Sequence, residues 1–182
     1  DFKQAEASIK RLKKINLQPV EDDNANLIRV HNIEGKINFK KVNFEYKKDN
    51  QVLKNINLEI KKGEVTAFVG ASGAGKSTML ALILKFITPN NGEILIDDKN
   101  LKLLNTKDIR KNIALVQQQP FLFSGKIIDA IRMGRSFTKE EVIESAKKAN
   151  AHHFIQQLPE KYETKITERG SNFSGGQIQR IA

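Results

Sequence analysis

Apolar and polar residues alternate along the first part of the chain, which is the pattern of strands with one buried face. Residues 36–46 alternate with one slip in phase after Phe39, which predicts a bulge or a turn within the strand. A second alternating stretch covers residues 53–60, and Lys62 and Gly63 supply a turn after it. We therefore expect two half-buried antiparallel strands.

Further along, the pattern changes to continuous apolar runs. Residues 65–69 are almost entirely apolar, which predicts a strand buried on both faces, as in a parallel sheet. Another strand is expected to begin at residue 94, and a third to cover residues 113–116. These runs predict a sheet core beside the antiparallel strands.

Helical spacing separates and follows these runs. Helices are expected over residues 75–86, 106–111 and 127–133. A longer helix opens with Thr138-x-x-Glu141, which is a capping-box pattern. Its expected apolar face consists of Val142, Ile143, Ala146 and Ala149.

The N-terminal residues carry a helical pattern of their own. Phe2, Ala5, Ile9 and Leu12 are spaced by three and four positions, which predicts the tail of a helix whose body lies upstream. Residues 16–32 contain Pro19 and an acidic cluster, as is typical of a linker.

Composition narrows the class of protein. The 182 residues include 31 Lys and Arg against 21 Asp and Glu, a formal charge of +10. Because the basic residues are scattered without interleaved aromatic rings, a solvated surface is favoured over nucleic-acid binding, with membrane proximity second.

The chain has no cysteine, which excludes disulfides and thiolate metal sites, and its three histidines argue against a His-rich site. The longest apolar run, residues 79–84, is far below the about 18 residues that span a bilayer, and no leader is recognised. We expect a cytosolic domain.

A glycine-rich segment carries the clearest chemistry. Residues 70–78 read Gly-Ala-Ser-Gly-Ala-Gly-Lys-Ser-Thr, which satisfies G-x-x-x-x-G-K-[ST]. The strand expected before it and the helix expected after it are the context that this phosphate-binding loop requires. Its backbone N–H groups are expected to point at phosphate oxygens. The loop consists of Gly70, Ala71, Ser72, Gly73, Ala74 and Gly75.

The next three residues supply side chains for the same ligand. Lys76 can reach the β- and γ-phosphates, the Ser77 hydroxyl can hold Mg²⁺, and Thr78 can add a hydroxyl on the α-phosphate side. The helix that follows directs the positive end of its dipole at the same anion. The segment therefore predicts binding of a nucleoside triphosphate.

A second element narrows the family. A P-loop alone does not choose between kinases, GTPases, motor proteins and transport ATPases. Downstream, Ser174, Gly175, Gly176 and Gln177 read Ser-Gly-Gly-Gln, with Ser174 suited to cap a following helix. Together the two elements resemble the nucleotide-binding domain of an ABC transporter, whose signature sequence is Ser-Gly-Gly-Gln. The resemblance implies an α/β P-loop NTPase with an antiparallel β subdomain, a parallel-sheet core whose C-terminal part is missing, and a helical subdomain.

Further segments resemble the family's motifs in order. Tyr46 lies where the family stacks an aromatic ring on adenine, and Gln118 resembles the Q-loop glutamine that contacts Mg²⁺ and the attacking water. Residues 121–125 resemble the exporter version of the region that touches the membrane domain's coupling helix, and residues 164–170 resemble the exporter X-loop. Residues 1–15 resemble the end of the last transmembrane helix in fused exporters.

The resemblance also implies a mechanism and partners. Two such domains pair head to tail, so that Ser174, Gly175 and Gly176 of one hold the γ-phosphate bound at Lys76 of the other. Lys76 and Gln118 are the expected catalytic residues, ATP and Mg²⁺ the expected ligands, and a transmembrane domain the second partner. We expect the protein at the cytoplasmic face of a membrane, with no nucleic-acid partner.

This assignment implies three regions. Residues 1–32 form a helix tail and linker from a membrane domain. Residues 33–116 form the β subdomain and the P-loop core, and residues 117–182 form the Q-loop, the helical subdomain and the start of the signature helix.

Some positions depart from the family. Phe173 replaces the usual Leu before the signature and is expected to fill the same pocket. Thr167 replaces an X-loop glycine, which disfavours positive φ there, and Asp98 stands at a turn where glycine is common.

The family continues beyond Ala182 with a strand ending in Asp-Glu and a switch histidine. We therefore expect this chain to be part of a longer polypeptide and not to hydrolyse ATP alone.

We assign no catalytic role to the three histidines, His31, His152 and His153. Three alternatives stay open: a soluble ABC-type ATPase acting on nucleic acid or ribosomes, an importer ATPase, and a nucleotide-binding fragment without hydrolysis.

Overall fold

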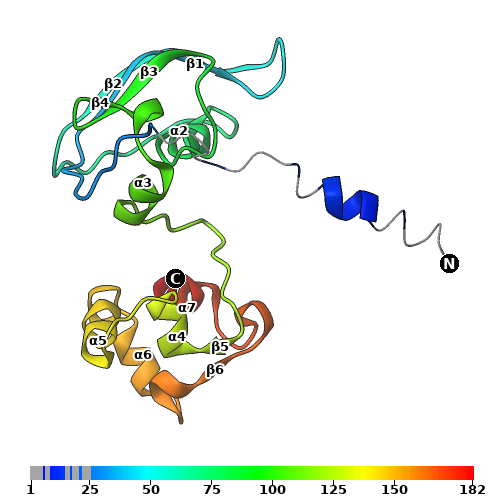
Figure 1. The fold of residues 1–182 in the computed structure, drawn as a ribbon. Helices are drawn as coiled ribbons and strands as arrows, with labels where there is room; N and C mark the ends of the chain where they lie inside the picture. The colour runs from blue at the N-terminus through cyan, green and yellow to red at the C-terminus, as the bar shows by residue number, and fades with distance from the viewer. Residues whose placement is uncertain (1–5, 7–8, 15–16, 18–20, 22–25) are drawn as a thin grey trace. The chain divides into compact units, whose positions relative to one another are not determined.

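The computed structural model describes residues 6, 9–14, 17, 21 and 26–182 (Figure 1). The chain divides into two compact units, residues 1–114 and 115–182, and each has its own hydrophobic core. Of the predicted N-terminal stripe, Phe2 and Ala5 lie outside the described residues, as does Pro19, whereas residues 9–14 are helical.

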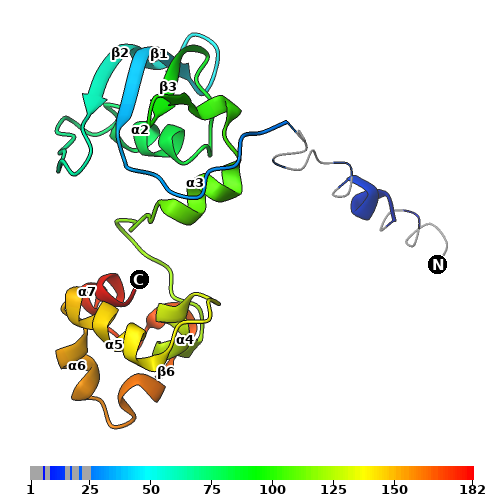
Figure 2. The same ribbon diagram turned by 60° about the vertical axis from the view of Figure 1, so that its left-hand side comes forward.

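The first unit is built on a four-stranded antiparallel sheet with the strand order β2-β1-β3-β4, of which Figure 2 labels β1, β2 and β3. The strands are β1 (Ile37–Glu45), β2 (Gln51–Ile60), β3 (Asn91–Ile96) and β4 (Lys99–Asn100). Both alternating stretches are therefore confirmed as strands. The predicted irregularity is also confirmed, because the β1–β2 register shifts between Phe39 and Val42.

Helix α2 (Lys76–Ile83), the 3₁₀ turn η1 (Leu101–Leu103) and helix α3 (Thr106–Asn112) complete this unit. The helix expected over 75–86 ends at Ile83, because Lys85 has a φ of 54° and leaves the helical conformation. Apolar side chains of α2 and of the sheet form the core. They include Phe39, Val42, Phe44, Leu53, Met79, Leu82, Ile83, Ile94 and Ile96.

The strands expected over residues 65–69 and 113–116 are not formed, which corrects the sequence analysis. Val65 and Val69 are 97% and 92% exposed, not buried on both faces. A strand exists only through hydrogen bonds to a neighbour, and none of the strands in the described part of the chain pairs with either segment. The paired strands of the described residues are all antiparallel, and the predicted parallel-sheet core is not present in them.

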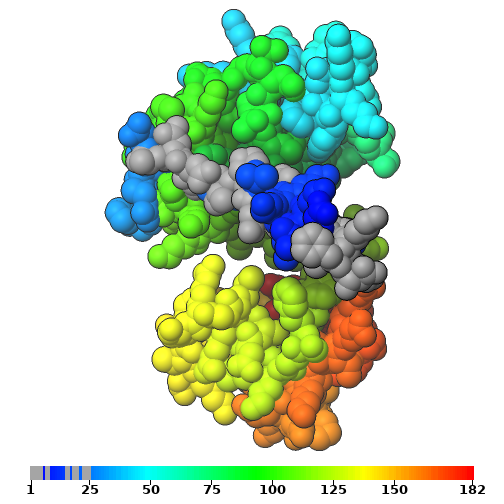
Figure 3. Space-filling view, turned by 45° about the vertical axis from the view of Figure 1, so that its right-hand side comes forward, coloured from blue at the N-terminus to red at the C-terminus, as the bar shows by residue number. Residues whose placement is uncertain are grey.

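The second unit is mainly helical, and its atoms are coloured green-yellow to red in Figure 3. Its elements are β5 (Gly125–Lys126), α4 (Ile127–Arg132), α5 (Lys139–Lys148), α6 (His152–Gln156), η2 (Lys161–Glu163), β6 (Lys165–Ile166), η3 (Glu168–Gly170) and α7 (Gly175–Ile181). Strands β5 and β6 form a two-stranded antiparallel sheet. The core contains Leu122, Ile127, Ile128, Val142, Ala146, Ala151, Phe154, Ile155, Tyr162, Ile166 and Ile181.

The capping box of α5 is confirmed. The Glu141 backbone N–H donates to the Thr138 hydroxyl at 3.2 Å, and the Thr138 N–H donates to the Glu141 carboxylate at 2.8 Å. Val142 and Ala146 are buried as expected, but Ala149 is exposed because the helix has already ended there, at its C-cap.

The backbone accommodates two of the departures from the family pattern. Thr167 has a φ of −76°, and the positive φ values fall on Arg169 and Gly170. Asp98 takes a φ of 61°, a left-handed conformation that Asp tolerates, and its carboxylate accepts a bond from the Lys36 ammonium at 2.9 Å. None of the helices in the described residues is long and apolar enough to cross a membrane.

Candidate nucleotide-binding site

The predicted P-loop is an exposed turn that leads directly into α2. Gly73 and Gly75 have φ values of 82° and 85°, which lie in the left-handed region that favours glycine. Gly75 is also the N-cap of α2, and a Cβ at this position would lie 2.6 Å from Leu53 Cδ2 of the neighbouring strand. The tight turn and the close packing of the helix against β2 therefore both require glycine at residue 75.

Lys76 folds back over this loop. Its ammonium donates to the backbone oxygens of Gly70 at 2.8 Å and Ala71 at 2.7 Å. The loop is closed by a further bond from the Ala74 N–H to the Ala71 oxygen at 3.2 Å. A positive charge thus lies against the loop at the N-terminal end of α2, which is the end that attracts anions.

The two hydroxyl residues after Lys76 differ in their surroundings. Ser77 is exposed, whereas Thr78 is only 5% exposed. The Thr78 hydroxyl lies 3.2 Å from the Tyr46 hydroxyl, so the two side chains share a hydrogen bond. Thr78 is therefore engaged with Tyr46, a partner that the sequence analysis did not foresee.

Tyr46 directly follows β1 and lies beside the first turn of α2. Its ring forms an edge-to-face pair with the ring of Phe44, with ring centroids 4.8 Å apart and planes at 90°. Tyr46 is 59% exposed, although its ring pairs with Phe44 and its hydroxyl with Thr78. The structure thus brings the ring predicted to stack on adenine next to the loop predicted to hold phosphates.

Arg110 of α3 binds the C-terminal end of α2, the helix that follows the P-loop. Its guanidinium donates to the backbone oxygens of Leu84 and Lys85, both at 3.0 Å, and lies over the Phe86 ring at 4.7 Å. It also forms a two-pronged ion pair with Glu21 at 2.6 and 2.8 Å. A cation at this end satisfies carbonyls that the helix leaves without partners.

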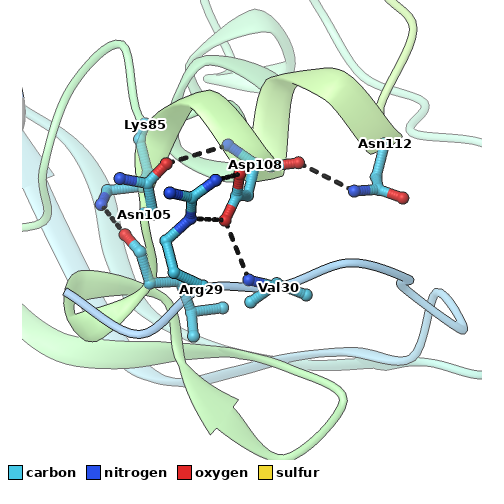
Figure 4. Close-up of polar contacts among 7 residues, drawn as sticks. Arg29, Val30, Lys85, Asn105, Asp108 and Asn112 are labelled. Carbon is cyan, nitrogen blue, oxygen red and sulfur yellow. Dashed lines mark hydrogen bonds and ion pairs between the residues drawn. The ribbon is translucent and has the colours of Figure 1, made fainter.

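Asp108, two positions before Arg110, joins α3 to the segment before β1 (Figure 4). Its carboxylate accepts bonds from the Arg29 guanidinium at 2.7 and 3.0 Å and from the Val30 N–H at 3.0 Å. The bonds from Arg29, together with the Val30 N–H, lower the pKa of Asp108 below its ordinary value. Sequence reasoning missed both α3 residues, because nothing in their local pattern indicates a charged side chain in a tertiary contact.

The remaining predicted ligands lie in the second unit. Gln118 is exposed and lies within a bend. Ser174 caps α7 as predicted: its hydroxyl accepts from the Gln177 N–H at 3.3 Å, and the Gln177 side chain accepts from the Ser174 N–H at 2.9 Å. The Gln177 side chain is thus engaged within the cap. Gly175 and Gly176 are exposed, and a Cβ on either would meet nothing within 4 Å.

Contacts of Arg180 stabilise the signature helix, α7. Arg180 donates to the backbone oxygens of Gly176 and Asn150, both at 3.1 Å, and its guanidinium lies 5.1 Å from the centre of the Phe154 ring. Phe173 is partly buried and packs against the core of this unit.

The second unit also carries an apolar cavity of about 510 Å³. Phe121 and Phe123, which are 54% and 79% exposed, line it in an edge-to-face pair. The cavity therefore includes the segment expected to touch a membrane domain. Its other lining residues include Leu115, Val116, Pro120, Leu122, Ala130 and Met133.

The paired histidines lie in α6, apart from these motifs in the sequence. The His152 Nδ1 atom lies 2.8 Å from the Tyr162 hydroxyl, which is a packing role for this side chain. Within the described residues, no group of three or more His, Cys, Asp or Glu side chains could hold a metal ion.

Comparison with known proteins identifies the family. A family model described as ABC transporter matches residues 53–182, more than half of the chain. The chain belongs to the ABC transporter family. It carries the ATP-binding domain of that family, with the P-loop and the signature both inside the matched region.

Two relatives show how far the similarity extends. The chain is 46% identical over 166 residues to ABC transporter B family member 19 of Arabidopsis thaliana, covering 90% of this chain and 13% of that protein. It is 49% identical over 152 residues to a Staphylococcus aureus protein named as a multidrug export ATP-binding/permease protein, covering 82% of this chain and 26% of that protein. The chain thus spans a small part of these ABC transporters.

A solved structure gives the same result for the fold. The chain is similar to a bacterial Atm1-family ABC exporter with ATP bound, with a TM-score of 0.84 and 31% sequence identity. The alignment covers 98% of this chain and 32% of that one. The ABC-type P-loop fold expected from the sequence is therefore confirmed.

Proposed function

We propose that this chain binds MgATP through residues 70–78 and that, within a longer protein, it hydrolyses ATP to power export across a membrane. The observation that carries the proposal is the convergence of Lys76, the exposed loop and Tyr46 at one end of α2. A loop with a fixed cation and a partly open aromatic ring offers separate contacts for phosphates and for a base. Family membership and the exporter relatives support the same function.

Each residue is given a role in this proposal. Lys76 would exchange its two backbone acceptors for β- and γ-phosphate oxygens, and the N–H groups of residues 70–75 would surround the same phosphates. Tyr46 would stack on the adenine ring with its exposed face. The exposed hydroxyl of Ser77 is an oxygen donor, which fits a magnesium ion, and Gln118 of the second unit is assigned to the same ion by the family resemblance alone. Bound Mg²⁺ would neutralise charge on the phosphates as the γ-phosphate is transferred to water.

The signature segment is proposed to act on a second nucleotide-binding domain. Ser174, Gly175 and Gly176 would hold the γ-phosphate that Lys76 of the paired domain binds. Gly175 and Gly176 are exposed and have open space where a Cβ would be, so a ligand can approach their backbone closely. Binding of ATP between two domains would then shift the population toward the paired state.

The apolar cavity around Phe121 and Phe123 is proposed to receive the coupling helices of a transmembrane domain. The two exposed phenylalanines that line this cavity favour an apolar partner over water. This contact would place the domain at the cytoplasmic face of the membrane. Through this contact, the nucleotide-driven pairing of two domains would change the conformation of the transmembrane domain that carries the transported substrate.

Replacement of Lys76 tests the central step. In isothermal titration of the full chain with MgATP, Lys76→Ala is expected to weaken binding about a hundredfold or more, because two charge-assisted contacts to phosphate are lost. Lys148→Ala, which removes an exposed lysine of α5, is the matched control and should bind like wild type. Unchanged affinity in a Lys76→Ala protein with a wild-type melting curve would overturn the phosphate assignment.

A further inference from the structure

The C-terminal end of α2, opposite the P-loop, is bound by side chains from α3. Within the described helix α2, the last turn holds no basic residue of its own. The Arg110 guanidinium instead donates to the backbone oxygens of Leu84 and Lys85, both at 3.0 Å. In the other direction, the Lys85 ammonium donates to the backbone oxygen of Leu104, two residues before α3 begins. The end of α2 and the start of α3 are therefore joined by bonds in both directions.

The chain before β1, which we call the upstream segment (Glu21 and residues 26–34), is attached to the same helix at two places. The Glu21 carboxylate accepts two bonds from Arg110, at 2.6 and 2.8 Å. The Asp108 carboxylate accepts bonds from the Arg29 guanidinium and the Val30 N–H (Figure 4). Residues two positions apart on a helix do not face each other, so the upstream segment binds α3 on two different sides.

Backbone bonds extend this attachment. The Ile28 N–H donates to the Leu103 oxygen at 2.8 Å, and the Asn105 N–H donates to the Ile28 oxygen at 2.9 Å. Val30 is 9% exposed and belongs to the hydrophobic core to which α2 also contributes. The upstream segment is thus part of the packed unit that carries the P-loop.

Arg110 is the side chain that contacts both α2 and the upstream segment. Its Nε and Nη2 atoms bond to carbonyls at the end of α2, and its Nη1 and Nη2 atoms bond to Glu21. Because a guanidinium is planar and rigid, these carbonyls and the carboxylate are held in a fixed relation. Helix α2 has eight residues and is therefore only ~12 Å long, with the P-loop at one end and Arg110 at the other. A displacement of Arg110 would move such a short helix as a unit.

We infer that Arg110 is a positioning residue for the P-loop, through which the upstream segment and the nucleotide site influence each other. This inference rests on the proposed function, because it takes residues 70–78 as the MgATP site. Coupling between two sites is reciprocal. An upstream segment seated on α3 favours nucleotide binding, and bound MgATP stabilises the seated segment. Within a longer protein, a movement that pulls the upstream segment off α3 would lower the affinity for MgATP.

Hydrogen exchange of the full chain, with and without MgATP, tests this reciprocity. In wild type, MgATP is expected to slow exchange in residues 70–78 and also, about fivefold or more, at the amides of Ile28 and Val30. The amides of β3 report the general stabilisation that any bound ligand gives, and this contribution is subtracted. In Arg110→Gln, MgATP should still slow exchange in residues 70–78 but no longer at Ile28 and Val30. Lys111→Gln, which removes the adjacent exposed lysine, is the matched control and should behave like wild type.

The exchange pattern separates the failure of this inference from the failure of the proposed function. Slowing in residues 70–78 of wild type without slowing at Ile28 and Val30 would overturn the inference alone. Equal slowing at Ile28 and Val30 in wild type and Arg110→Gln would do the same. No slowing in either region of wild type would overturn the proposed binding of MgATP, and the inference with it.

Titration with MgATP separates positioning from a purely structural role of Arg110. At a temperature where both proteins are fully folded, Arg110→Gln is expected to weaken MgATP binding about threefold to tenfold, although the residue lies at the far end of α2 from the P-loop. Glu21→Gln removes only the contact to the upstream segment, and an exposed ion pair contributes little, so its loss should be about twofold to threefold. A purely structural role would lower the melting temperature of Arg110→Gln and leave its affinity unchanged, which would contradict the inference.

The double variant tests whether Glu21 acts through Arg110. Glu21→Gln should weaken MgATP binding no further when Arg110 is already glutamine, whereas additive losses would overturn the link. If Arg110→Gln fails to fold, Glu21→Gln decides together with wild type. Unchanged affinity in Glu21→Gln, with wild-type slowing at Ile28 and Val30, then contradicts the inference.

Discussion

The P-loop and the signature are both glycine-rich turns that open a helix, and both are fastened by an arginine. Arg110 bonds to carbonyls at the far end of the P-loop helix and lies over Phe86. Arg180 bonds to the Gly176 carbonyl within the signature helix and lies near Phe154. In each case a cation and an aromatic ring fix the helix that carries the turn.

The two turns differ in why they contain glycine. Gly75 has a left-handed φ and leaves no room for a Cβ beside Leu53. Gly175 and Gly176 have neither feature. Neither glycine has a positive φ, and a Cβ on either would meet nothing within 4 Å. The fold of this chain thus requires glycine in the P-loop. In the signature, only a ligand or partner approaching from outside would require it, which is the role proposed above.

The largest effect on stability is expected from Gly75→Ala. The added methyl group would overlap Leu53 and strain the backbone, so the free energy of unfolding should fall by about 2 to 4 kcal/mol. Urea denaturation of the full chain, followed by circular dichroism, measures this change. A Gly75→Ala protein as stable as wild type would remove the contrast between the two turns.

An intermediate effect is expected from Asp108→Asn, which keeps the shape of the side chain and removes its charge. The variant weakens the bonds to Arg29 and Val30 that join α3 to the segment before β1. The melting temperature should fall by less than in Gly75→Ala and by more than for an exposed aspartate such as Asp129→Asn, which serves as the control.

The effect of Asp108→Asn should depend on pH. Arg29 lowers the pKa of Asp108 in the folded chain, so the stabilisation is complete above the ordinary value of 3.8 and is lost as pH falls through the lowered pKa. The gap in melting temperature between wild type and variant should therefore be constant from neutral pH to about pH 5 and close in stronger acid. A gap that widens in acid would contradict the assigned ion pair.

The smallest effect on stability, with a large effect on function, is expected from Gly176→Ala. Alanine favours helix over glycine, so the free energy of unfolding should stay within about 1 kcal/mol of wild type, on the stable side. MgATP binding to the single domain should be unchanged, while ATP-driven pairing, followed by analytical ultracentrifugation of the complete transporter, should be lost. Normal pairing in this variant would contradict the proposed phosphate contact.

Local pattern predicted much of the fold and of the candidate site. The strands at 36–46 and 53–60, the capping box at Thr138 and the cap at Ser174 were all readable, because each depends on residues a few positions apart. Where a prediction depended on distant partners, it was less reliable. An apolar run such as 65–69 indicates a strand only if a neighbouring strand pairs with it, and the described residues supply none.

The sequence by itself determined the family, the P-loop and the signature, since residue type and spacing define these motifs. Only the tertiary structure decided that Thr78 bonds to Tyr46, that Asp108 is buried against Arg29, and that Gly75 faces Leu53. The physical reason is range: caps and loops are formed by neighbours in the chain. A buried carboxylate or a hydroxyl pair is stabilised by whichever distant side chain the fold brings to within hydrogen-bonding distance.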